Sequence, residues 1–306
     1  MANIEPIRPS DVAHPGPFRH DLIHVRGLRL HVAHTGQPTN PLILLLHDWP
    51  GAWFDYFWLL EPLAQHGYHV AALDNRGVGL SDKPPSGYDT IVAAGDVASI
   101  IRALGHDDAI LVGAGSGGTI AWATAARYPI NIRAIVSICG TWPGLVNTLA
   151  WRHPFAASGQ LLARAISHFP PLAARALRRR PMALSRWITT RAAATPLSGQ
   201  PLHHLDTIAH WRGLHARVDR VPEKLARWAK IPTERLPRRW ATHPIPAPAL
   251  CIDDGTAWWA HACDASSNYT TSHHRASCAG RLPYITAPED LADTIADFAQ
   301  GLTTPR

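Results

Sequence analysis

The chain has 306 residues, a formal net charge of +6 at pH 7 and an isoelectric point near 9.5. Its hydrophobic fraction of 46% and mean hydropathy of −0.09 exclude a chain too polar to bury a core. The first residues lack the basic-then-apolar pattern of a signal peptide, and apolar runs such as 42–46 are too short to span a bilayer. We therefore expect a soluble, cytoplasmic protein.

Strand-like and helix-like segments alternate along the first part of the chain. After a loose leader over 1–16, two alternating runs at 19–25 and 28–36 predict a hairpin. Four apolar runs then predict buried strands, and the stretches between them predict helices. The strands are expected at 42–47, 69–75, 109–115 and 133–140, and the helices near 53–66, 89–104 and 118–128. Apolar strands separated by helices imply a parallel sheet covered on both faces.

A change of pattern predicts an inserted helical lid over 141–240. This stretch is rich in Ala, Leu, Arg and Trp at helical spacing, and it holds 15 Arg and 2 Lys against 2 Asp and 2 Glu. The strand pattern returns at 247–255, and a last helix is expected to open near 287. We therefore divide the chain into a first core part, 1–140, the basic lid, and a second core part, 241–306.

Three motifs occur in a fixed order along the predicted sheet. They are HDWPG at 47–51, DNRGVGLSDKP at 74–84 and VGAGSGGTIAW at 112–122. Together they resemble the α/β-hydrolase fold, and within it the epoxide-hydrolase-like branch. The resemblance implies an α/β core with an oxyanion loop at the first motif and a nucleophile elbow at the third.

The resemblance places the nucleophile slot of the elbow at a residue without a side chain. Family members carry Ser or Asp two residues before the paired glycines. Gly117 and Gly118 fix that register, so the slot falls on Gly115. A one-residue slip would instead put Ser116 at the tip, and this alternative stays open.

The other two triad slots also depart from the family pattern. The histidine slot, between Gly280 and a Pro-Glu pair, holds Arg281, and arginine cannot act as a base at neutral pH. His273 and His274 could replace it only if the last loop rearranged. The acid slot after the returning strand holds Ala257. A small shift would offer one of three carboxylates there: Asp253, Asp254 or Asp264.

The oxyanion loop departs at one position. His47, Asp48 and Trp49 line the expected pocket together with Ser116, and Asp48 stands where the family usually has glycine. A carboxylate there would repel the negative charge that develops in an oxyanion hole. The resemblance to epoxide hydrolases also implies lid tyrosines, but none of the six tyrosines falls within 141–240.

These departures predict a catalytically inactive member of the family, a pseudoenzyme with a binding, scaffolding or regulatory role. The alternative is an active esterase or epoxide-hydrolase-like enzyme with a non-standard site built on Ser116. Neither interpretation requires a cofactor or a metal ion. Four cysteines lack metal-type spacing, and we expect free thiols, although Cys263 and Cys278 could pair in an exported chain.

The basic lid predicts an interaction surface. Arginines alternate with apolar residues at near-helical spacing, a pattern that suits a peripheral contact with an anionic membrane, a lipid-like ligand or a protein partner. We do not expect a nucleic-acid partner, because no binding fold accompanies the charge. The expected contact residues are Arg178, Arg179, Arg180, Arg186 and Trp187.

Overall fold

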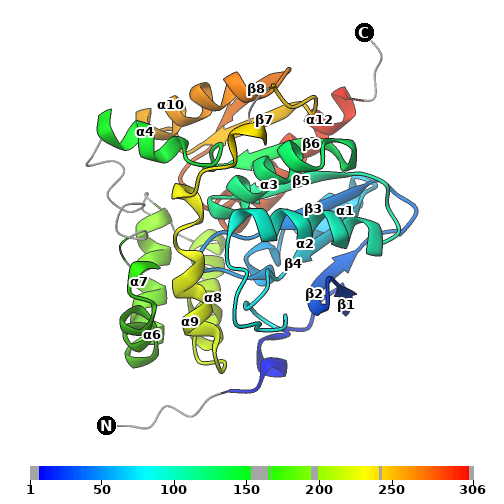
Figure 1. Ribbon diagram of the computed structural model, residues 1–306. Coiled ribbons are helices and arrows are strands. Elements are labelled where there is room, and N and C mark those ends of the chain that lie inside the picture. The colour runs from blue at the N-terminus through cyan, green and yellow to red at the C-terminus, as the bar shows by residue number, and fades with distance from the viewer. Residues whose placement is uncertain (1–6, 153–164, 166, 194–198, 241–242, 303–306) are drawn as a thin grey trace.

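A computed structural model describes residues 7–152, 165, 167–193, 199–240 and 243–302. Its centre is an eight-stranded sheet in the order β1-β2-β4-β3-β5-β6-β7-β8 (Figure 1). β1 and β2 form the predicted antiparallel hairpin, β2 is antiparallel to β4, and all neighbours from β4 to β8 are parallel. The strands are β1 (Arg19–Val25), β2 (Leu28–Thr35), β3 (Leu42–Leu46), β4 (His69–Leu73), β5 (Ala109–Ala114), β6 (Ile132–Ile138), β7 (Ala249–Asp253) and β8 (His273–Ser277).

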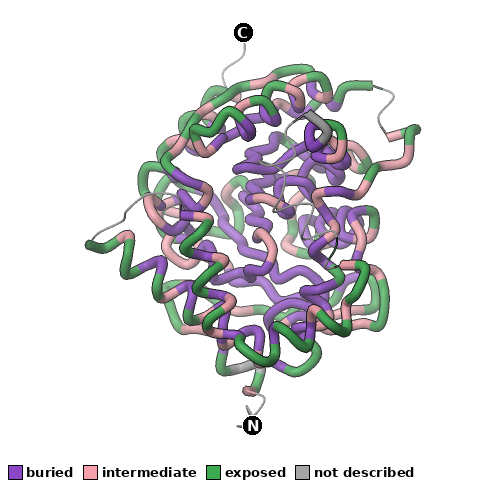
Figure 2. Tube along the Cα trace, turned by 90° about the vertical axis from the view of Figure 1, so that its left-hand side faces the viewer, coloured by how far each residue is buried: buried purple, intermediate pink, exposed green. Residues whose placement is uncertain are grey.

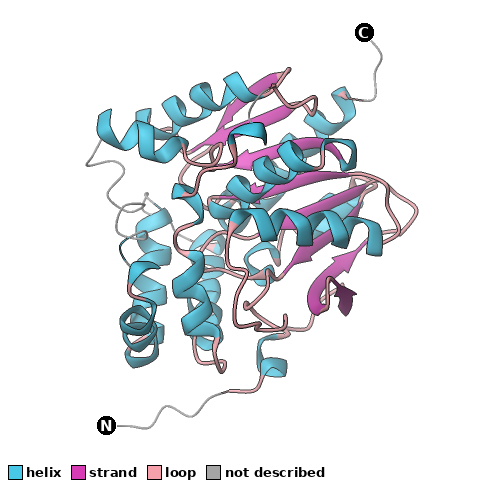
Figure 3. Cartoon of the chain, viewed as in Figure 1, coloured by secondary structure: helices cyan, strands magenta, loops and turns pink. Residues whose placement is uncertain are grey.

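Helices lie on both sides of this sheet (Figure 3). β3, β4, β5 and β7 are buried along their whole length, which explains why they are written as continuous apolar runs. Figure 2 shows the buried strands inside and the exposed turns of the helices outside. The core helices are α1 (Leu60–Gln65), α2 (Thr90–Ala103), α3 (Ser116–Arg127), α10 (Ala257–Ser266), α11 (Pro283–Thr286) and α12 (Pro288–Gly301).

The described chain between β6 and β7 is helical and contains no strand. In Figure 1, α6 to α9 stand beside the sheet as a separate group. The described elements between β6 and β7 are α4 (Leu145–Arg152), α6 (Pro170–Arg179), α7 (Pro181–Ala193), α8 (Gln200–His215), α9 (Val221–Trp228), and the 3-10 turns η4 (Ile231–Thr233) and η5 (Arg238–Trp240). Two hydrogen bonds from indole N–H groups join this group to the core: Trp49 donates to the carbonyl of Leu225 at 2.7 Å, and Trp228 donates to that of Arg76 at 2.8 Å.

Two expectations about elements were wrong, and one strand was not predicted. The leader is not loose where it is described: η1 (Pro9–Val12) forms a 3-10 turn, Val12 is fully buried, and His14 stacks on Trp211 with ring centroids 3.9 Å apart. The helix expected at 53–66 is divided into the 3-10 turn η2 (Trp53–Tyr56) and α1. β8 was missed because HHRAS is a polar strand at the sheet edge, without an apolar run to mark it.

Candidate active site

A sharp turn joins β5 to α3 at the carboxyl edge of the sheet. Gly115 lies at its tip with φ +47° and ψ −110°, and Ser116 is the first residue of the helix. Glycines allow the helix to approach the sheet: a Cβ on Gly117 would lie 1.9 Å from the carbonyl oxygen of Leu46, and one on Gly113 would lie 2.4 Å from Gly117. The turn is therefore centred on residue 115.

The carboxylate of Asp48 fills the space beside this turn. A Cβ built on Gly115 would lie 2.2 Å from Oδ1 of Asp48 and 2.4 Å from Oδ2. Oδ1 accepts hydrogen bonds from the backbone N–H groups of Trp49, at 2.7 Å, and Ser116, at 2.8 Å, and from Oγ of Ser116, at 3.1 Å. The N-terminus of α3 also favours a negative charge at this point. A carboxylate from the loop thus occupies the place that an elbow side chain would take.

Hydrogen bonds of His47 and Gly51 fix the loop that carries Asp48. His47 is buried, its Nδ1 lies 2.9 Å from the carbonyl oxygen of Asp48, and its Nε2 accepts the backbone N–H of Asn75 at 3.3 Å. Because a carbonyl can only accept, Nδ1 carries the proton and Nε2 is the acceptor. The backbone N–H of Gly51 closes the turn by donating to the Asp48 carbonyl at 2.8 Å. These contacts position His47 as a support for the loop.

The second motif acts as scaffolding for the same loop. The buried carboxylate of Asp74 accepts the backbone N–H groups of Trp53, at 2.9 Å, and Leu80, at 3.1 Å, and contacts Nδ1 of His31 at 2.8 Å. Burial alone would raise the pKa of Asp74. The hydrogen bond from His31, the positive charges nearby and the backbone N–H of Trp53 outweigh the effect of burial, so the pKa lies below its usual range. Asp74 therefore joins the segment after the oxyanion loop to the segment after β4.

Arg281 occupies the predicted histidine slot between β8 and α11. Its backbone N–H donates to the carbonyl of Ala192 at 3.2 Å, and its guanidinium lies 5.4 Å from the ring centroid of Trp259. Its Nε is buried and has no hydrogen-bond partner among the described residues. The side chain packs against an aromatic ring and offers no base.

The predicted acid slot also lacks a carboxylate, since Ala257 is the first residue of α10. Two of the alternative acids, Asp253 and Asp264, contact Arg275 at 2.8 and 3.1 Å. Asp254 accepts the backbone N–H of Thr256 at 3.0 Å. Each alternative carboxylate is therefore engaged by a group other than a histidine.

His273 and His274 begin β8 and are not part of the last loop. Their register partners are Ala249 and Leu250, the first two residues of the parallel strand β7. They therefore lie at the amino edge of the sheet, whereas Gly115 lies at its carboxyl edge. This placement separates both rings from the elbow.

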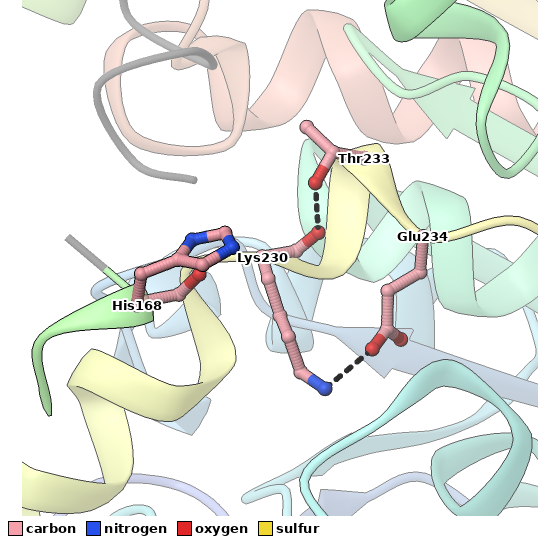
Figure 4. A pocket seen from close by; sticks show the side chains of 5 residues that line it. His168, Lys230, Thr233 and Glu234 are labelled. Atoms are coloured by element: carbon pink, nitrogen blue, oxygen red, sulfur yellow. Dashed lines mark hydrogen bonds and ion pairs between the residues drawn. The ribbon is translucent and has the colours of Figure 1, made fainter. Parts of the chain in front are cut away.

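A cavity of about 350 Å³ lies elsewhere, between the residues just before α6 and the turn η4 that follows α9 (Figure 4). In it, Lys230 Nζ lies 2.6 Å from Glu234, whose other oxygen accepts the backbone N–H of Thr90 at 2.7 Å. The lining residues are Ser167, His168, Lys230, Thr233 and Glu234. The cavity shares no lining residue with the elbow, so it is a separate feature.

The predicted lid contacts lie on α6 and α7. Arg178 forms an ion pair with Glu223, and Arg186 lies 3.8 Å from Asp206. Arg179 and Arg180 are exposed at the end of α6. Trp187 is 53% exposed. Half of the predicted arginines are thus partly compensated by nearby acids.

Thiols and metal ligands add no further site within the described ranges. Cys139, Cys251 and Cys263 are buried and Cys278 is half-buried, and all four are free. No group of three described His, Cys, Asp or Glu residues is arranged to hold a metal ion. No described helix is both long and apolar enough to cross a membrane.

The sequence gives the departures at 48 and 115 as two separate signals, whereas the structure brings the two residues together. The repulsion expected of Asp48 in the oxyanion hole stays a prediction; its Oδ1 accepts both of the N–H groups that would form that hole. A missing side chain at one motif and an extra carboxylate at another could have suggested that the two share one position. Only the fold shows that the Asp48 carboxylate lies where a side chain of residue 115 would be.

Residues 41–201 match the family model described as the alpha/beta hydrolase fold. AB hydrolase superfamily protein YfhM of Bacillus subtilis (strain 168) is 33% identical over 134 residues, which are 43% of this chain and 47% of that protein. Epoxide hydrolase 3 of Xenopus tropicalis is 33% identical over 130 residues, which are 42% of this chain and 35% of that protein. The matched part is thus less than half of either relative.

Solved structures resemble the described chain over nearly its whole length. The epoxide hydrolase CorEH without ligand has a TM-score of 0.71 at 19% identity, covering 93% of this chain and 99% of that one. A putative acyltransferase from Salmonella enterica has a TM-score of 0.79 at 18% identity, covering 95% and 98%. At these identities the likeness shows the fold alone, which is the predicted α/β-hydrolase fold.

Proposed function

This chain belongs to the α/β-hydrolase fold family, and from that premise we propose that it hydrolyses small apolar epoxides or esters at a non-standard site. The observation that carries the proposal is the convergence of two backbone donors. The N–H groups of Trp49 and Ser116 point at one position, 2.7 and 2.8 Å away, which Oδ1 of Asp48 now fills. Donors fixed in this way stabilise an oxygen that carries developing negative charge.

The surroundings of these donors suit a reaction site. Gly115, Asp48 and Trp49 are half-buried, so the Asp48 carboxylate keeps some exposure to solvent, while His47 and Ser116 are buried. The name epoxide hydrolase, which the Xenopus relative bears, supports the choice of epoxides as one substrate class. The breadth of the fold family supports the inclusion of esters.

Ser116 contributes to this site as a donor. Its side chain is only 6% exposed, and its Oγ lies 3.1 Å from the Asp48 carboxylate. The left-handed backbone conformation belongs to Gly115, so the hydroxyl is at the first position of the helix and not at the tip of the turn. We therefore assign Ser116 to the support of Asp48.

The test is a turnover assay on styrene oxide and p-nitrophenyl acetate with the wild type and Ser116→Ala. We expect turnover by the wild type and a loss of roughly tenfold or more in kcat for the variant, since a donor at the charged oxygen is removed. Ser99→Ala is the matched control, because its hydroxyl bonds only to the carbonyl of Gly95 in its own helix. Wild-type rates equal to the buffer rate on both substrates would overturn the proposal.

A second candidate is a pseudoenzyme that binds a partner through its basic lid. It is favoured by two residues: Gly115 has no side chain to attack a substrate, and Arg281 cannot move a proton at neutral pH. Removing members of a catalytic triad costs on the order of 10⁴ to 10⁶ in turnover. The lid would then contact an anionic membrane, a lipid-like ligand or a protein partner.

A further inference from the structure

We infer that Asp48 is the nucleophile of this site, and that it supplies from the oxyanion loop the carboxylate that the elbow lacks at Gly115. The inference rests on the proposed function and names the residue that performs it. It starts from one overlap: the space that a Gly115 side chain would need is already filled by both oxygens of Asp48. The Asp48 carboxylate can therefore occupy this space only because residue 115 is glycine.

The two oxygens of Asp48 differ in a way that suits attack. Oδ1 accepts three hydrogen bonds, from the N–H of Trp49 and from the N–H and Oγ of Ser116. Oδ2 makes no hydrogen bond to any described residue, and the side chain is half-buried. One oxygen is thus held in place, while the other keeps a lone pair for a substrate.

The N–H groups of Trp49 and Ser116 can also stabilise Oδ1 after the attack. When Oδ2 forms a bond to carbon, Oδ1 becomes the carbonyl oxygen of an ester and keeps its N–H donors. When water later adds to that ester, negative charge develops on Oδ1 at the same donors. A single arrangement therefore serves both the formation and the breakdown of a covalent adduct.

With an epoxide the steps balance as follows. Oδ2 attacks a ring carbon, the ring C–O bond breaks, and its electron pair stays on the ring oxygen, which takes a proton from water. A second water molecule then adds to Cγ of Asp48 and the Cγ–Oδ2 bond breaks, so that Oδ2 leaves with the diol. One proton of this water goes to the departing oxygen, and the other neutralises the hydroxide that the first step left. The products are a diol and the regenerated carboxylate, and one water is consumed in all.

The second step is expected to be the slow one. Arg281 stands in the histidine slot and cannot take a proton from water. His47 cannot replace it, because its Nδ1 contacts the Asp48 carbonyl and its Nε2 accepts from Asn75. The adduct on Asp48 should therefore accumulate before it is hydrolysed.

The experiment is to incubate the full chain with styrene oxide and to measure intact mass, followed by peptide mapping. We expect one styrene oxide per chain, attached to Asp48, and no adduct in Asp48→Asn. In H₂¹⁸O, hydrolysis should introduce ¹⁸O into the Asp48 carboxyl group. Asp290→Asn is the matched control, since that carboxylate is exposed on the first turn of α12 and should not affect labelling.

A second variant keeps the test decisive if Asp48→Asn folds poorly. In Asp48→Gly with Gly115→Asp, the carboxylate moves to the elbow, and the adduct should move to residue 115. Labelling of that variant without labelling of the wild type would overturn the inference, and so would an absence of adduct from both. If Asp48 is labelled without turnover, the inference stands and the proposed function fails. If turnover persists in folded Asp48→Asn, the proposed function stands and the inference fails.

Discussion

The Asp55 carboxylate and the Arg212 guanidinium form a two-point ion pair, with contacts of 2.7 and 3.0 Å, between the core and helix α8. Asp55 is fully buried and Arg212 is 3% exposed. Asp55 lies in η2, a few residues after Asp48, so the pair anchors α8 close to the candidate site. Arg212 also donates to Oγ1 of Thr189 at 3.1 Å, which extends the link to α7.

Breaking this ion pair on one side should destabilise the protein strongly. Arg212→Met leaves the Asp55 carboxylate buried without its partner, and we expect the free energy of unfolding to fall by about 3–5 kcal/mol. Asp55→Leu combined with Arg212→Met should recover most of that loss, because no charge is left buried. Urea denaturation measures both. Arg29→Met is the control, since its pair with Asp82 is exposed and should contribute less than about 1 kcal/mol.

If Arg212→Met lost no more stability than Arg29→Met, the pair would not be an anchor of α8.

The overlap between Gly115 and Asp48 predicts an energetic coupling. Gly115→Ala should lower the free energy of unfolding by about 3 kcal/mol, from left-handed strain and from crowding against the carboxylate. In an Asp48→Gly background only the strain remains, so the cost should fall to about 1–2 kcal/mol. Gly105→Ala is the control: its φ is +87°, but nothing lies within 4 Å of the added Cβ. Equal costs of Gly115→Ala in the two backgrounds would show that the side chains do not meet.

Much of the fold could be predicted from short-range features of the sequence. The strands β3, β4, β5 and β7 are covered on both faces, so each appears as an apolar run. Gly113 and Gly117 mark the elbow because any side chain there would collide with neighbouring backbone. The start of α2 is also local, since the Asp89 side chain accepts the N–H of Val92 at 2.9 Å.

The rest depended on contacts between distant segments. β8 is an edge strand with polar residues, and only its pairing with β7 defines it. Val12 in the leader carries no local signal for burial, which comes from the elements that surround it. Asp48 was identified as a departure from the family pattern, but the hydrogen bonds from Ser116 span 68 positions in the chain. Motif comparison along a sequence cannot show that two departures share one place.

Acid should destabilise the protein through His215. Burial lowers the pKa of His215 to about 3, and its Nε2 accepts the backbone N–H of Gly79 at 2.6 Å. The unfolded chain has a histidine pKa of about 6.5, so between pH 6.5 and 3 it binds a proton that the folded chain does not. The free energy of unfolding should therefore fall as the pH drops below about 6.5, with up to about 1.4 kcal/mol per pH unit from this residue.

Denaturation of the wild type and His215→Gln at pH 7 and pH 5 measures this contribution. We expect the variant to be less stable at pH 7, because it loses the acceptor for Gly79, but to lose less stability on acidification. Equal pH dependence in both proteins would exclude His215 as a source of acid sensitivity.

The basic lid predicts electrostatic binding to anionic lipid, which we expect to depend on the arginines of α6 and α7. Phe169, Leu172 and Trp187 are 64%, 67% and 53% exposed on the same helical group, so apolar side chains are available beside the charge. Each arginine near an anionic surface contributes about 1 kcal/mol, and replacing four by Gln should weaken binding by roughly 10²- to 10³-fold.

Sedimentation with phosphatidylserine-containing vesicles, against pure phosphatidylcholine, measures the effect. The variant carries Gln at Arg178, Arg179, Arg180 and Arg186, and the control carries Gln at the exposed Arg8, Arg19, Arg102 and Arg133. Equal binding to both vesicle types, or equal losses in the two variants, would reject a specific role for the lid.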